Sequence, residues 1–135
     1  MNILLIQAQS KKPGDAPVMP IGLCYLGTAL SGSGHQVSIF DTNTSRNPVP
    51  EIQKIISGSG PNIIGISLRN IDSSLYLDRN HYVQPFGELL SAVKESAPQT
   101  KIMAGGPGFS IYGQELMERL PLIDFGIFNE GEESA

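Results

Sequence analysis

The sequence predicts an α/β domain in which helices cover both faces of a five-stranded parallel sheet. Five short runs rich in Ile and Val alternate with helical patterns along the 135 residues. The runs are almost continuously apolar, which is typical of strands covered on both faces and therefore of a parallel sheet. Alternating strands and helices form a doubly wound sheet with right-handed crossovers. We therefore expect one flavodoxin-like (Rossmann-like) domain with strand order 2-1-3-4-5 and three α/β/α layers.

Local patterns place the individual elements. Strands are expected at 2–7, 36–42, 62–68, 101–105 and 123–128. Helices are expected at 20–34, 50–60, 81–98 and 112–121. The first two helices carry apolar residues at helical spacing and end in glycines. Pro85 is expected near the start of its helix, where a missing N–H matters least.

After the fifth strand the sequence reads "NEGEESA" and stops. A further helix would normally cover the sheet face beside the last strand. The apolar strip left there is exposed, covered by another chain, or covered by residues outside this sequence. We favour the last alternative and expect residues 1–135 to be the N-terminal part of a longer protein.

Composition excludes several classes of function. A net charge of −4 and a pI near 5.0 argue against nucleic-acid binding. Cys24, the only cysteine, cannot form an internal disulfide, so we expect a cytoplasmic protein. Together with His35 and His81 it has no zinc or iron–sulfur ligand spacing. No apolar run approaches the roughly 18 residues of a membrane span.

The expected binding edge lies at the carboxyl ends of the strands, where open α/β sheets bind their ligands. The loops predicted at this edge are 7–20, 67–80, 105–110 and 129–133. The first two are long for this architecture. In "KIMAGGPGFSIYG" (101–113), a buried strand runs into three glycines and a proline. Such a sequence indicates that something comes close to the main chain there.

Common ligands can be tested by the motifs that they need. The loop 7–20 contains one glycine, so the dinucleotide motif G-x-G-x-x-G is absent, although Asp41 ends the second strand, where dinucleotide-binding domains place a ribose-binding acid. The G-x-x-x-x-G-K-[ST] and G-x-S-x-G motifs are also absent. The third strand ends "SLRN", without the aspartate of a phospho-receiver domain.

Four segments, in order, resemble the cobalamin-binding domains that precede radical S-adenosylmethionine (SAM) modules. They are "MPIGLCYLGTALSGSGHQVSIFDT", "PNIIGISLRN", "AGGPGFS" and "IDFGIFNEGEES". The resemblance covers nearly the whole chain. It implies a corrinoid-binding domain, at 1–135, of a radical SAM methyltransferase or cyclase, itself without catalytic residues. It also implies that SAM and a four-iron cluster belong to a C-terminal module of the same chain.

The resemblance also implies which residues contact cobalamin. In that family the corrinoid lies over the carboxyl edge and its nucleotide tail reaches down among the strands. Gly105, Gly106 and Gly108 would leave room for the tail, and Pro107 would hold the turn. Contacts to the corrin or its amides, and to its last side, would come from Gly22, Leu23, Ser67, Arg69, Asn70, Glu130, Gly131 and Glu132.

The chain departs from the cobalamin domains of mutases and methionine synthase. Those domains carry D-x-H-x-x-G after the first strand, whereas Asp15 is followed here by "APVMP". We therefore expect cobalamin to be bound without that histidine ligand. The S-x-L motif is also incomplete, because Arg69 stands where the leucine belongs.

Other interpretations remain open at this point. The glycines could serve turns alone, and Arg69 and Asn70 could pair with Asp72 or Asp78. Glu130, Glu132 and Glu133 could favour a helix N-terminus through its dipole. The whole chain could also be the N-terminal half of a nucleotide-sugar glycosyltransferase, where "GHQVSIFD" would be at home, or a cofactor-free protein-interaction domain.

Overall fold

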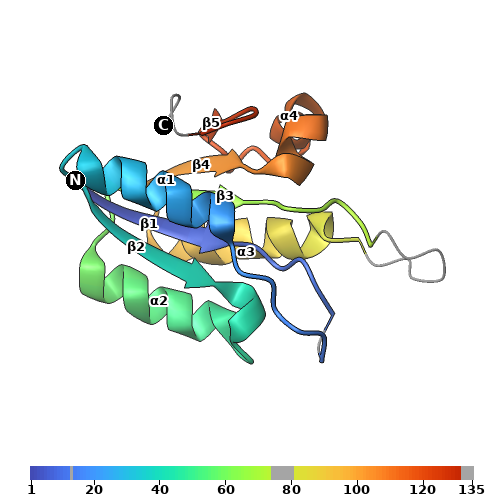
Figure 1. The fold of residues 1–135 in the computed structure, drawn as a ribbon, viewed down its shortest axis with the longest axis horizontal. Helices are drawn as coiled ribbons and strands as arrows, with labels where there is room; N and C mark the ends of the chain where they lie inside the picture. Colours follow the sequence, from blue (N-terminus) through green and yellow to red (C-terminus); the bar gives the residue numbers. More distant parts are fainter. Residues whose placement is uncertain (13, 74–80, 132–135) are drawn as a thin grey trace.

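The computed structural model describes residues 1–12, 14–73 and 81–131 and contains a five-stranded parallel sheet (Figure 1). The strand order is β2-β1-β3-β4-β5, as predicted. In chain order the elements are β1 (Asn2–Gln7), α1 (Ile21–Gly32), β2 (Gln36–Asp41), the 3-10 helix η1 (Thr42–Thr44), α2 (Pro48–Ser59), β3 (Ile63–Ser67), α3 (Val83–Ser96), β4 (Lys101–Gly105), α4 (Pro107–Arg119) and β5 (Phe125–Gly126).

The two faces of the sheet are covered unequally. On one face, alternate strand residues such as Ile6 and Ile64 pack with Phe86 of α3 and Phe109 of α4 in the main core. On the other face a smaller cluster joins β1 to α1 through Ile3, Leu5, Leu23 and Leu30. Phe125 of β5 is 53% exposed. The second face is therefore well covered only where α1 lies.

The start of α4 and the length of β5 differ most from the prediction, and the other helix and strand bounds agree with it within two residues. Helix α4 begins at Pro107 and not at residue 112, because Gly106 takes a positive φ of 97° as N-cap and Pro107 opens the helix. The backbone at Tyr112 leaves helical geometry (φ −128°), so the predicted start marks a kink inside α4. Strand β5 has two residues rather than the predicted six.

The carboxylate of Asp124, which directly precedes the short β5, forms hydrogen bonds with β4. Asp124 accepts hydrogen bonds from the Lys101 ammonium at 2.7 Å and from the Ile102 amide at 2.9 Å. These bonds, the Lys101 bond first, hold the pKa of Asp124 below its usual value. The charged pair and the backbone bond together compensate for the few ladder bonds of β5.

No helix within the described ranges is long and apolar enough to cross a membrane.

Candidate functional site

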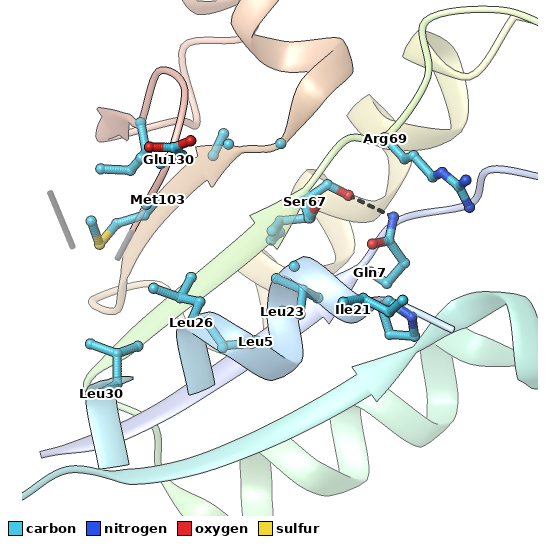
Figure 2. A pocket seen from close by; sticks show the side chains of 18 of the residues that line it. Leu5, Gln7, Ile21, Leu23, Leu26, Leu30, Ser67, Arg69, Met103 and Glu130 are labelled. Atoms are coloured by element: carbon cyan, nitrogen blue, oxygen red, sulfur yellow. Dashed lines mark hydrogen bonds between the residues drawn. The ribbon is translucent and has the colours of Figure 1, made fainter. Parts of the chain in front are cut away.

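A groove of about 590 Å³ lies between α1 and the less covered face of the sheet (Figure 2). Its floor includes Ile3 and Leu5 of β1 and Met103 of β4, and its α1 wall includes Leu26 and Leu30. The groove runs from Gln7 at the carboxyl end of β1 to Met1 at its amino end. Six strand residues at about 3.3 Å each make it roughly 20 Å long.

Polar and apolar side chains occupy different parts of the groove. The middle is lined by aliphatic side chains and Met103. At the carboxyl end, which we call the mouth, the polar lining residues are Gln7, Ser67, Arg69, Asn129 and Glu130. His35 precedes β2 and therefore lines the opposite, amino end. This arrangement suits an elongated ligand with an apolar part inside and a polar part outside.

Most of the residues predicted to contact a ligand line this groove. They are Gly22, Leu23, Ser67, Arg69, Gly105, Gly106, Pro107, Glu130 and Gly131. Asn70 and Gly108 do not line it, and Glu132 lies outside the described residues. The contacts of these residues with a ligand stay a prediction.

Gly106 and Gly108 are required because another part of the same chain passes close to their backbone. A Cβ on Gly106 would lie 2.6 Å from Ser67 Oγ and 2.8 Å from the Leu68 carbonyl oxygen. A Cβ on Gly108 would lie 3.0 Å from the Arg69 carbonyl group. The loop after β3 is thus what comes close to this main chain. Gly105 differs, because its Cβ would meet only Ile127 at 3.4 Å, and it lines the groove.

The N-terminus of α4 is already occupied by an acceptor from the same loop. The amides of Gly108 and Phe109 both donate to the Leu68 carbonyl oxygen, at 3.0 and 3.3 Å. Exposed amides at a helix N-terminus would otherwise bind an anion such as phosphate. An anionic group of a ligand therefore finds no free donors at this helix start.

The N-terminus of α1 does have free donors. Its N-cap residue, Pro20, provides no side-chain cap, and the first turn contains no acidic residue. The amides of Gly22 and Leu23 have no acceptor among the described residues, and both residues line the groove. The start of α1 is consequently the better location for a negatively charged part of a ligand.

Charged groups of opposite sign stand on two sides of the mouth. Arg69 forms no ion pair with any residue that the structure describes, and Asp72 instead pairs through its backbone with His81. Asp78 lies outside the described residues. Glu130 lies across the groove from Gln7 (Figure 2). The loop of Glu130 is fixed by the Asn129 amide, which donates to Ser110 Oγ at 3.0 Å.

The first long loop is fixed by Asp41 and Asn43. The Asn43 side chain accepts from the Ser10 amide at 2.8 Å and donates to the Ala8 carbonyl at 3.2 Å. Asp41 Oδ1 in turn accepts from the Asn43 amide and side chain, at 2.9 and 2.7 Å. One oxygen of the Asp41 carboxylate is thus engaged within the chain, which disfavours the dinucleotide alternative, in which this acid would bind a ribose.

Sequence reasoning missed two features of the mouth. Val18, Met19 and Ile21 form an exposed apolar rim before and at the start of α1, between 55% and 67% exposed. Gln7 ends β1 with only 5% of its surface exposed. Alternation along β1 could have placed Gln7 on the α1 face, but it could not have shown that a groove opens beside Gln7.

The structure has no cluster of three or more candidate metal ligands in the described ranges.

A known protein-family model covers most of this chain. The family model described as the B12 binding domain matches residues 15–135. No curated protein matches the chain.

The solved structures that resemble the chain include two of the radical S-adenosylmethionine methyltransferase TsrM from Kitasatospora setae. One has its tryptophan substrate and a SAM analogue bound (TM-score 0.87) and the other cobalamin and a [4Fe-4S] cluster (TM-score 0.86). Each is 24% identical over 98% of this chain. The chain spans only 24% of the TsrM chain.

A CheY-like protein, TadZ from Pseudomonas aeruginosa, shares the fold at 16% identity. The match has a TM-score of 0.60 and covers 97% of this chain and 92% of that one.

Proposed function

Because the chain belongs to the B12-binding domain family, we propose that it binds cobalamin with the nucleotide tail in the groove and the corrin over the mouth. The observation that carries the proposal is the division of the groove into an apolar middle and a polar mouth. A benzimidazole base is a flat apolar group, and its burial against aliphatic side chains is favourable. The amide-rich corrin needs polar partners instead.

Of the residues at the mouth, some would contact the corrin and others the nucleotide tail. Ser67, Arg69 and Glu130 offer polar side chains to the corrin amides, and Gly131 lies beside Glu130. Gly105 keeps the entrance to the groove open. The free amides of Gly22 and Leu23 would receive the phosphate of the tail, since those of α4 are occupied. Gly106, Pro107 and Gly108 support this site by shaping the turn, and Asn70 through its contact with Gly108.

We further propose that cobalt has no histidine ligand from the first loop. The next histidine along the chain after that loop is His35. It lines the amino end of the groove, roughly the length of β1 from the mouth. Bound cobalamin supplies a cobalt centre that can carry a methyl group. The residues of this domain hold and orient that cofactor.

The similarity to TsrM supports a second module in the same protein. We propose that residues 1–135 precede a radical SAM module that contributes SAM and a four-iron cluster. The coding sequence downstream of Ala135 tests this directly. A C-x-x-x-C-x-x-C motif in the following few hundred codons is expected, and a long extension without it would contradict the proposal.

Retention of cobalamin tests the binding function. The chain is incubated with hydroxocobalamin, desalted, and its visible spectrum recorded; we expect about one corrinoid per chain. Leu26→Trp fills the groove from a partly exposed position and should reduce retention at least about tenfold. Tyr25→Trp, on the exposed neighbouring position of α1, is the matched control and should retain cobalamin normally. Equal retention of cobalamin by the two variants would contradict the proposal that the nucleotide tail lies in the groove.

A further inference from the structure

Gln7 is a buried polar side chain at the mouth of the groove. It is the last residue of β1 and pairs in register with Ser67 of β3 and Asp41 of β2. Its side chain lies on the face of Ile3 and Leu5, so it follows the apolar floor at the point where the groove opens. Only 5% of Gln7 is exposed.

The orientation of the Gln7 carboxamide is determined by its neighbours. Its Nε2 lies 3.3 Å from both the Ala8 and the Ser67 carbonyl oxygens. Carbonyl oxygens only accept hydrogen bonds, so the amide nitrogen must face them and Oε1 must face away. Figure 2 shows Nε2 directed at Ser67 and Oε1 on the side of the groove. Oε1 has no donor among the residues that the structure describes.

The fold does not require this carboxamide. The Ser67 carbonyl already accepts from the Ala8 amide at 3.0 Å, and the Ala8 carbonyl from Asn43 Nδ2 at 3.2 Å. Both acceptors would therefore stay satisfied without Gln7. Within the described residues, only His35 Nδ1 is a buried side-chain N or O atom without a partner, so Gln7 Oε1 is open to solvent in the groove. A ligand that displaces water from Oε1 must supply a donor in its place, or it loses that hydrogen bond.

We propose that Gln7 Oε1 accepts a hydrogen bond from a neutral N–H or O–H group of the bound corrinoid and so helps to select it. The inference rests on the proposed cobalamin-binding function. A phosphate oxygen at this point would face a second acceptor, so the tail phosphate lies elsewhere. The donor is then either an amide of the corrin side chains or a ribose hydroxyl of the tail.

The test compares Gln7→Met with the unaltered chain in equilibrium titrations with cobalamin and cobinamide, which lacks ribose, phosphate and base. Methionine keeps the length and shape of the side chain and removes the acceptor. Loss of one hydrogen bond to a buried group should weaken cobalamin binding about three- to tenfold. Gln53→Met makes the same change on the exposed surface of α2 and should bind normally.

The two ligands distinguish the source of the donor. Weaker binding of both ligands to Gln7→Met identifies a corrin amide, and weaker binding of cobalamin alone identifies the ribose. Equal affinity of Gln7→Met and the unaltered chain for cobalamin overturns the role of Gln7 while leaving the proposed function intact. No binding by the unaltered chain overturns both. Circular dichroism melting checks folding, and Gln7→Leu replaces Gln7→Met if the latter does not fold.

Discussion

Gly106 is the residue that fixes the shape of the carboxyl edge most directly. Its φ of 97° is unfavourable for any side chain, and its Cβ would meet the side chain of Ser67 and the backbone of Leu68. The sequence predicted a close approach at this glycine and the resemblance attributed it to a ligand, whereas the groups that approach it in the structure belong to Ser67 and Leu68. The sequence could not identify the approaching group, because Ser67 lies far away along the chain and the contact exists only in the folded sheet.

Replacing Gly106 therefore affects stability before it affects binding. Gly106→Ala should lower the free energy of unfolding by about 3 kcal/mol through backbone strain and the clash with Leu68. Gly34→Ala is the matched control, because Gly34 also has a positive φ (87°) but no neighbour within 4 Å. It should cost about 1 kcal/mol. Urea denaturation measures both, and equal costs would show that the contact with the loop after β3 is unimportant.

At the scale of elements, α1 and α4 illustrate what sequence patterns can and cannot predict. Both helices were predicted, α1 from the spacing of its apolar residues, and the type of every predicted strand and helix is confirmed. The start of α4 was missed because Gly106 and Pro107 were interpreted as loop residues, although proline is common at the first position of a helix. The short length of β5 was missed because an apolar run indicates that residues are buried. It does not indicate how many backbone hydrogen bonds they form with the neighbouring strand.

The different starts of these helices predict where negative charge is tolerated. Gly22→Asp adds a carboxylate to the first turn of α1, where a Cβ has no neighbour within 4 Å. The helix dipole should make the ligand-free domain about 0.3–1 kcal/mol more stable than the neutral Gly22→Asn variant. Cobalamin binding should nevertheless be about three- to tenfold weaker than in Gly22→Asn, because the carboxylate repels the tail phosphate.

Cobinamide supplies the control for this prediction, since it has no phosphate. Thermal melts and equilibrium titrations with both ligands on the two variants give the six values needed. If Gly22→Asp and Gly22→Asn bound cobalamin equally well, the phosphate would not lie at the start of α1.

At the scale of the whole molecule, the site exists because one face of the sheet is incompletely covered. Helix α1 shields β1 and β2, whereas Met103 of β4 lines the groove and Phe125 of β5 is exposed. The strand order, which the structure confirms, and the expected location of the binding edge both followed from the alternation of elements. The groove itself could not be derived that way, because it depends on the distance between α1 and β4 and on which face each residue occupies.

The most direct test of the whole account is the ratio of the affinities of the unaltered chain for cobalamin and cobinamide. Burial of the benzimidazole base in the apolar groove is worth about 1.5–3 kcal/mol, so cobalamin should bind at least about tenfold more tightly. Isothermal titration gives both affinities and the stoichiometry, which should be one. Equal affinities, or no binding of cobalamin, would contradict the claim that this groove receives the nucleotide tail.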